Sequence, residues 1–391
     1  MPMIGFSYPL LLLAAVPVYW FVLRREWRSL FLAALSLGFV AAHGTALACR
    51  LAAMAAAAYL CAQAMRRMPP AAGRTAILLT AVAALAADLF FRKWSGPGYS
   101  GALVSSRPAI IPLGLSYVTF RLVHYIVESY RDRAPRSSFA GFLSYVLFFP
   151  TFLAGPVERF ERFHAQTVAA EPDLRQVNYG LARIALGMLK KAFLADGLAR
   201  LTLPVLRAPA EHPPAWALLG VYALALQVYL DFSGYTDIAV GSARLFGYRI
   251  VENFDRPFLQ PNIARFWRSW HISVSTFIRD YFFLPLFGYR ASALKLYLGL
   301  VAAMVVFHLW HGFSSNYLLL GLYHGLGLAG WRMFQELQSR HAGLKRLMAC
   351  RAAESFSVLA TFTFVSLGMV LFVCDTERAF AVYRQIGLLF R

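Results

Sequence analysis

Cysteine and acidic side chains are scarce in this chain of 391 residues. The four cysteines are scattered, and no two of them form a C-x-x-C pair or a zinc-like spacing. This pattern indicates neither a disulfide framework nor a metal site. Charged residues make up only 15% of the sequence, with 19 Asp and Glu against 38 Lys and Arg. Such a composition is unusual for a soluble globular domain, so the sequence argues against a soluble enzyme.

Apolar residues dominate instead, at 59% of the chain, and the mean hydropathy is +0.55. The formal net charge of +19 is typical of proteins that meet nucleic acid, anionic lipid or an acidic partner. In a chain this apolar, we expect the positive charge to lie in short loops beside a lipid bilayer. No nucleic-acid-binding module is recognisable, so we expect no nucleic-acid partner.

The sequence contains nine apolar runs of about the length that crosses a hydrocarbon core, which takes roughly 17–25 helical residues. These runs are 4–23, 29–48, 75–91, 109–127, 139–154, 214–230, 296–310, 316–334 and 355–373. Two weaker stretches, 51–65 and 179–194, and a more charged one, 266–287, add to them. The sequence therefore predicts an all-α, polytopic membrane protein with about nine to eleven transmembrane helices plus re-entrant or interfacial helices. The runs lack the period-2 alternation of a β-barrel.

No repeat of fixed period, low-complexity linker or apolar-poor region large enough for a soluble domain interrupts the runs. We therefore expect one membrane domain over residues 1–391. The first run has no basic residues before it and no small-residue cleavage site after it, so we expect a retained membrane segment. Basic clusters punctuate the runs, at 24–28, 66–74, 92–107, 131–136, 190–191 and 340–351.

Two carboxylates continue the apolar run after residue 230. Asp231 and Asp237 lie in a window, 231–241, that also contains two glycines. Ionisable residues inside a membrane are costly and suggest a functional site. The structural alternative is close helix packing at the glycines, with the carboxylates paired to arginines such as Arg244 or Arg249.

The stretch 266–287 mixes aromatic rings with Arg268, His271, Arg279 and Asp280. It is too polar to face lipid and too aromatic for a solvated loop. Such a segment is tolerated at membrane depth where protein or a water-filled cavity surrounds it. The alternative is an interfacial amphipathic helix with a belt of tryptophan and arginine.

Three of the nine histidines fall close together, at positions 308, 311 and 324. Histidine is the side chain best suited to proton transfer near neutral pH. His308 and His311 stand three residues apart and so can share a helix face. A metal site is disfavoured because the H-E-x-x-H motif is missing and no carboxylate lies nearby. Packing is the simpler explanation for His308 and His324.

Several separate blocks of this sequence resemble the membrane-bound O-acyltransferase (MBOAT) family. The blocks are 111–120, 148–160, 231–241, 252–258, 266–286 and 310–312. The resemblance covers about 111–328, with a fainter match at 377–383, and is similar to the branch that acylates bacterial polysaccharides. Alginate O-acetylation and, more distantly, teichoic acid D-alanylation typify that branch. The chain departs from the alginate branch at 287–290, where Phe-Gly-Tyr-Arg replaces Gly-Gly-Asn-Arg, and it is shorter, which leaves the acceptor open.

The resemblance implies a catalytic His311 with His271, 40 residues earlier, as its companion. His311 would act as general base on an acceptor hydroxyl that attacks an acyl thioester, while donors in the buried site hold the oxyanion. It also implies a central tunnel in a bacterial inner membrane. The donor would be acyl-CoA, most simply acetyl-CoA, or an acylated carrier protein, with no bound cofactor. The acceptor would be an envelope polysaccharide, reached directly or through a soluble or periplasmic acyltransferase partner.

Other side chains in these blocks are candidates for substrate or donor binding, because a cationic entrance suits phosphate-bearing donors. These candidates are Trp267, Arg268, Trp270, Arg279, Asp280, Trp310, Asn316, Glu158 and Arg159. A rival from another functional class is a multi-pass transporter or channel with a polar path lined by Asp231, Asp237 and His271. The sequence shows no internal duplication of the kind that would favour this rival.

Overall fold

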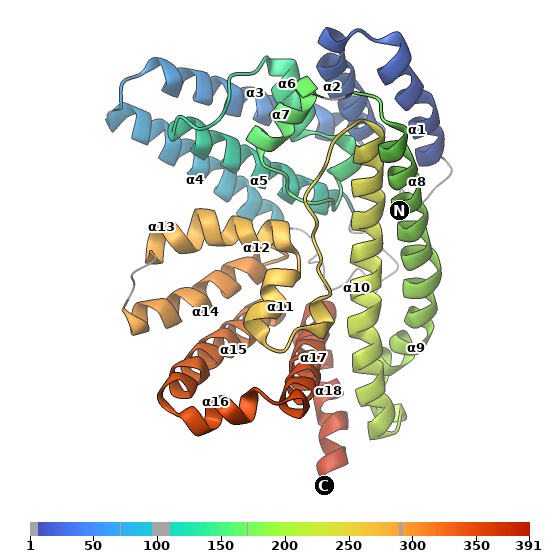
Figure 1. Cartoon of the computed structure of the whole chain (residues 1–391), viewed down its shortest axis with the longest axis vertical. Coiled ribbons are helices and arrows are strands. Elements are labelled where there is room, and N and C mark those ends of the chain that lie inside the picture. Colours follow the sequence, from blue (N-terminus) through green and yellow to red (C-terminus); the bar gives the residue numbers. More distant parts are fainter. Residues whose placement is uncertain (1–6, 71, 96–109, 170, 289–291) are drawn as a thin grey trace. The chain divides into compact units, whose positions relative to one another are not determined.

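The computed structural model describes residues 7–70, 72–95, 110–169, 171–288 and 292–391 (Figure 1). Throughout these residues the regular structure is helical, and the one β interaction among them is an isolated bridge between Phe254 and Trp270. The predicted all-α class is therefore confirmed. The start of the first apolar run, most of the basic cluster 92–107, and positions 289 and 290 lie outside the described residues.

Backbone contacts divide the chain into two compact units. The first comprises Met1–Arg92, Ala109–Leu189 and Gly234–Glu252, and the second comprises Lys93–Pro108, Lys190–Ser233 and Asn253–Arg391. The long helix α10 (Pro214–Leu245) contributes residues to both units. The single membrane domain over 1–391 stays a prediction.

The first unit is built from helices with a common aromatic core. Its helices are α1 (Ser7–Pro17) with the π-helical turn η1 (Val18–Val22), α2 (Arg25–Ala41), α3 (Thr45–Arg67), α4 (Ala72–Ser95), α5 (Ile110–Tyr130), α6 (Phe139–Val146), the 3₁₀ turn η3 (Phe149–Thr151), α7 (Phe160–Ala169) and α8 (Leu174–Met188). In the core, the rings of Tyr125 and Phe142 lie 4.1 Å apart, and those of Phe163 and Tyr248 stack at 4.4 Å. Burial of such rings supplies much of the packing energy of a helical core.

The second unit begins in the π-helical turn η4 (Leu189–Ala195) and holds most of the histidines. Its other elements are α9 (Asp196–Arg207), η5 (Pro209–Glu211), the first part of α10, η6 (Pro257–Leu259), α11 (Ile263–Ser269), α12 (Ile272–Ile278), the π-helical turn η7 (Arg279–Phe283), α13 (Leu284–Phe287), α14 (Ala293–Leu309), α15 (Ser315–Arg340), α16 (Ala342–Met348), α17 (Arg351–Val373), α18 (Thr376–Gly387) and η8 (Leu388–Phe390). Helix α15 packs along α14 and also contacts α11 and α17.

Four helices among the described residues are long and apolar enough to cross a membrane. They are Thr45–Arg67, Ala72–Phe91, Pro214–Leu245 and Arg351–Val373. Shorter apolar helices cover Ser7–Val22, Phe139–Thr151 and Ala293–Leu309. The four candidate spans indicate a chain that crosses the membrane more than once. The number of nine to eleven crossings stays a prediction.

Several of the predicted segments differ from the helices of the structure. The run 29–48 is not one helix, because α2 ends at Ala41 and a new helix starts at Thr45 after Gly44, whose φ is 156°. The stretch 51–65, judged weak by its sequence, is the middle of α3, which is itself a full candidate span. Its many alanines lower the hydropathy but are the best helix formers.

The run 139–154 is also broken, after α6. Arg121 is buried and donates to the carbonyl oxygens of Val146 at 2.9 Å, Tyr145 at 3.2 Å and Thr151 at 3.2 Å. These carbonyls would otherwise be unsatisfied where the helix ends. A Cβ at Gly155 would lie 2.5 Å from the Cα of Thr151, so the chain can fold back here only with glycine.

Glycines bring α8 and the C-terminal part of α10 into close contact within the first unit. A Cβ at Gly187 would lie 2.4 Å from the carbonyl oxygen of Gly234, and one at Gly241 would lie 2.5 Å from that of Gly180. Small residues at such positions let two helix backbones approach, which is the packing alternative raised for the window 231–241.

Candidate active site around two histidines

His271 lies at the junction between α11 and α12, where the backbone adopts a left-handed conformation. Its φ is 45° and its ψ is 49°. Non-glycine residues in this region carry strain, and such strain is concentrated at functional sites. The side chain is 2% exposed and lies outside the four candidate spans, and burial lowers the pKa of His271 to about 3. The imidazole is therefore neutral.

The strand-like segment before α11 holds this junction in place. Asn253 accepts hydrogen bonds through Oδ1 from the hydroxyl of Ser273 at 2.7 Å and from its amide at 3.3 Å. The amide of Ile272 donates to the carbonyl oxygen of Asn253 at 3.0 Å, on the far side of His271 from the bridge between Phe254 and Trp270. Backbone bonds on both sides thus fix the residue that carries the imidazole.

His311 follows the C-terminus of α14, and its amide donates to the carbonyl oxygen of His308 at 3.0 Å. The buried imidazole packs against Trp310, with ring centroids 4.1 Å apart, and against Phe372 of α17 at 5.0 Å. The ring of Tyr317, on α15, lies 5.9 Å away. Three helices thus enclose this imidazole in aromatic surroundings.

The two histidines contact the same two rings. Phe307 lies 6.2 Å from His271 and 6.4 Å from His311, and Trp310 lies 6.3 Å and 4.1 Å from them, all measured between ring centroids. Phe232, on α10, closes the other side of His271 at 4.7 Å. The structure therefore brings together two imidazoles that are 40 residues apart in the sequence, in a buried aromatic setting. Such a setting excludes water and strengthens electrostatic interactions with a reacting group.

A family model for the membrane-bound O-acyltransferases matches residues 114–346, which include both histidines. The chain belongs to the MBOAT family. This match covers more than half of the chain and confirms the family suggested by the sequence blocks.

Curated relatives of this chain belong to the branch of the family that acylates bacterial envelope polymers. The protein of Pseudomonas aeruginosa named "Probable alginate O-acetylase AlgI" is 36% identical over 67% of this chain and 49% of its own length. The teichoic acid D-alanyltransferase of Streptococcus thermophilus is 31% identical over 66% of this chain and 68% of that protein. The peptidoglycan O-acetyltransferase of Helicobacter pylori is 28% identical over 71% of this chain and 57% of that protein. The chain spans about half the length of the alginate relatives that it matches.

In this MBOAT chain, the other two clustered histidines form a separate group. The rings of His308 and His324 stack at 5.4 Å with an interplanar angle of 4°, and Trp267 stands perpendicular to both. His308 also bonds through Nδ1 to the carbonyl oxygen of Met304 at 2.8 Å. Trp267, predicted as a binding residue, therefore belongs to this second group and also contacts Phe307 of the first, at 4.8 Å.

Two further predicted residues hold the framework. Trp270 packs among Phe254 at 5.1 Å, Phe266 at 5.5 Å and Phe258 at 5.8 Å. Asn316, at the start of α15, donates through Nδ2 to the carbonyl oxygen of Leu371 on α17 at 3.0 Å. That bond ties together the two helices that carry Tyr317 and Phe372 against His311.

Glu158 and Arg159 belong to the first unit, and the Glu158 side chain is 2% exposed. Its two carboxylate oxygens accept from the amides of Arg159 and Val251, both at 3.0 Å. Nη1 of Arg159 lies 3.4 Å from Nδ1 of His124. Burial raises the pKa of Glu158 above its ordinary value. These bonds connect the segment after η3 with the segment after α10, so Glu158 organises the backbone of the first unit.

The remaining charged candidates lie at the surface of the second unit. Arg268 is exposed, and Nε of Arg279 bonds to Oδ1 of Asp280 at 2.8 Å in a pair whose arginine side chain is 58% exposed. Exposed cations remain available to an anionic partner, although a pair of this kind adds little to stability.

Both membrane carboxylates are paired, but with partners other than those expected from the sequence. Asp237 pairs with Arg183 of α8, which also bonds to both carboxylate oxygens of Glu252 at 2.9 Å. Asp231 pairs with Lys191 of the turn η4. Pairing with an arginine is therefore confirmed for Asp237, but that arginine comes from α8, which lies against α10 at the glycines described above. The transporter alternative needed Asp231 and Asp237 to line a polar path. Both carboxylates instead form ion pairs with basic side chains of the same chain, so this alternative is weakened.

Sequence reasoning missed the rings that enclose the two histidines, namely Phe232, Phe307, Tyr317 and Phe372. They lie on four different helices, and nothing in a single sequence distinguishes them among the 33 phenylalanines and 19 tyrosines of the chain. Of these four rings, only Phe307 could have been suggested by the sequence, because it directly precedes His308 in the block with the clustered histidines.

Proposed function

We propose that this MBOAT chain is an O-acyltransferase that moves an acyl group, most simply acetyl, to hydroxyls of a cell-envelope polysaccharide. The observation that carries the proposal is the meeting of His271 and His311 at Phe307 and Trp310. The curated relatives, whose names include alginate O-acetylase and peptidoglycan O-acetyltransferase, support both the acyl group and the class of acceptor.

The proposed reaction begins at the imidazole of His311. His311 takes the proton from the acceptor hydroxyl as the oxygen attacks the thioester carbonyl carbon. The tetrahedral intermediate then collapses, the carbon–sulfur bond breaks, and the imidazolium returns the proton to the leaving thiolate. A thiolate leaves readily, so one well-placed base in a water-poor site is sufficient.

His271 has a separate part in this proposal. Because its ring is neutral, one nitrogen carries a proton and the other carries a lone pair. A neutral imidazole can donate to the thioester carbonyl oxygen, where negative charge develops. Its fixed left-handed backbone keeps this donor in one place, which lowers the cost of reorganisation during the reaction.

The donor is proposed to be acyl-CoA or an acylated carrier protein that arrives from the cytoplasm. Exposed Arg268 and Arg279 supply positive charge for the phosphates of either donor. We further propose that the chain lies in a bacterial inner membrane and passes the acyl group through a tunnel, either directly to the polysaccharide or to a soluble or periplasmic acyltransferase partner. The relatives support an acceptor in the cell envelope, because their names describe acylation of alginate, teichoic acid and peptidoglycan.

The test is transfer of radiolabelled acetyl to envelope polymer in membranes that contain the wild-type chain or a variant at matched levels. Acetyl-CoA and an acetylated carrier protein are supplied in parallel reactions. We expect His311→Ala to lose label and His212→Ala, outside the site, to keep it. Equal label in the wild type and His311→Ala would refute the role of His311, and no label from either donor would refute the transferase proposal.

A further inference from the structure

The C-terminal end of α15, together with α16 and the start of α17, forms a corner of the second unit with unusual charge. Residues 331–351 contain five basic side chains and one acidic side chain. The acid, Glu336, forms an ion pair with Arg332, whose Nε lies 3.2 Å from Oε1, and accepts a hydrogen bond from the hydroxyl of Tyr297 at 2.8 Å. In the part of the chain that the structure describes, no ion pair forms at the four other cations, Arg340, Lys345, Arg346 and Arg351. We call these four residues the basic corner.

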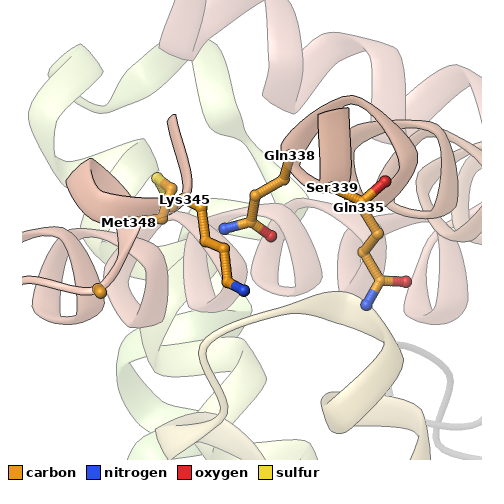
Figure 2. Close-up of a pocket in the computed structure, with 6 residues that line it drawn as sticks. Gln335, Gln338, Ser339, Lys345 and Met348 are labelled. Carbon is orange, nitrogen blue, oxygen red and sulfur yellow. The ribbon is translucent and has the colours of Figure 1, made fainter. Parts of the chain in front are cut away.

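A pocket of about 460 Å³, lined by four polar and two apolar residues, opens beside the basic corner. Gln335, Gln338 and Ser339 of α15 line one side of it, and Lys345 and Met348 of α16, with Ala349, line the other. Figure 2 shows the side chains of Gln335, Gln338 and Lys345 extending from the two helices toward the same open space. Two amides and an ammonium therefore supply hydrogen-bond donors to one site, a chemistry that suits the oxygens of a phosphate.

The position of the pocket along the chain places it beside lipid. Helix α17, a candidate membrane span, begins at Arg351, two residues after Ala349 of the pocket lining. Lysine and arginine at the ends of membrane spans lie at the level of the lipid head groups. Leu337 and Leu347, close to the pocket lining in sequence, are 48% and 63% exposed. Exposed leucine beside exposed cations is typical of a segment at a membrane interface.

We propose that this pocket binds the head group of an anionic phospholipid. The phosphate accepts from Lys345 and the two glutamine amides, and Arg340, Arg346 and Arg351 add long-range attraction from the basic corner. Exposed Leu337 and Leu347 contact the upper part of the acyl chains. Because arginine and lysine at a cytoplasmic surface attract anionic lipid, the proposal also predicts that this corner faces the cytoplasm.

The test measures lipid binding to the purified full-length chain in detergent by native mass spectrometry. Phosphatidylglycerol is compared with zwitterionic phosphatidylcholine, and CoA is added as a soluble compound that carries phosphates. We expect tighter binding of phosphatidylglycerol than of phosphatidylcholine, and weaker binding as salt is raised. Lys345→Gln should weaken phosphatidylglycerol binding roughly fivefold, the loss expected for one cation at an anionic head group.

Lys295→Gln is the matched control, because Lys295 is an exposed lysine at the start of α14, outside the pocket lining. It should leave binding unchanged. Equal binding of the two lipids, or equal affinity of wild type and Lys345→Gln, would overturn the proposal. Displacement of phosphatidylglycerol by CoA would assign the pocket to a soluble phosphate compound instead. None of these outcomes depends on acyl transfer, so the proposed function is tested separately.

Discussion

Two polar interruptions of apolar sequence look alike in this chain but have different surroundings. In the first unit, Arg121 of α5 donates to backbone carbonyls of the turn after α6, and Glu158, which follows that turn, accepts from backbone amides. In the second unit, His271 and His311 lie against the faces and edges of aromatic rings. Bonds to the backbone fix the path of the chain. Packing against rings holds the two imidazoles in position.

The strongest test of this contrast is His311→Asn, which keeps a polar side chain but removes the base. We expect acyl transfer to fall by roughly 10²–10⁴-fold, the range typical of general base catalysis. The thermal midpoint in detergent should fall only slightly. If the variant kept most of the transferase activity, His311 would have a structural role like that of Arg121 and Glu158, and the two regions would not differ in function.

Arg121→Met should have the opposite profile. The carbonyl oxygens of Tyr145, Val146 and Thr151 would each lose a buried donor. Each buried carbonyl left without a hydrogen-bond donor costs about 1–3 kcal/mol. We therefore expect the free energy of unfolding to fall by at least about 3 kcal/mol. Unfolding by SDS titration measures this change. A thermal midpoint like that of the wild type would show that the loop holds its conformation without Arg121.

Asp237→Asn tests whether the membrane carboxylates stabilise the structure. Loss of the charged hydrogen bond to Arg183 should cost about 1.5–3 kcal/mol of stability, because Asp237 is almost completely buried. The acyl-transfer rate per folded molecule should equal that of the wild type. A variant with full stability but no transfer would instead make Asp237 a functional residue.

The left-handed backbone at His271 gives a paired comparison at one position. Both His271→Gly and His271→Ala remove the imidazole, but only glycine adopts a φ of 45° without strain. We expect the glycine variant to be more stable than the alanine variant by about 1–2 kcal/mol, and both to lose transfer activity. Equal thermal midpoints would show that the backbone relaxes and stores no strain here.

Glu158→Gln should change how stability depends on pH. Burial raises the pKa of Glu158 above 4.5, so the folded state binds this proton more tightly than the unfolded state. Its contribution is therefore fully present below about 4.5 and is lost as the pH rises through the raised pKa. As the pH falls from 7 toward 4.5, the wild type should gain stability relative to the variant. The slope is limited to about 1.4 kcal/mol per pH unit for one proton. Parallel pH profiles would contradict this assignment.

The helical class and several spans could be predicted because they depend on local composition. The run 75–91 lies within α4, and the run 355–373 lies within α17. The break at Val146 was not visible to a hydropathy count, because Phe148, Phe149 and Phe152 keep the sequence apolar through the turn. The stretch 51–65 has a low hydropathy for a membrane span, although it lies within a full-length helix. Its alanines add little hydropathy but strongly favour helix formation.

The sequence by itself determined that this is an apolar helical chain of the MBOAT family, and it selected His271 and His311 from nine histidines through the blocks that contain them. Only the tertiary structure decided which side chains meet. It paired Asp237 with Arg183, assigned Trp267 to the stack of His308 and His324, and brought Phe307 between the two site histidines. The physical reason is that hydropathy and helix propensity act along the chain. Ion pairs and ring contacts depend on which helices pack together, and small residues such as Gly187 and Gly241 determine that packing.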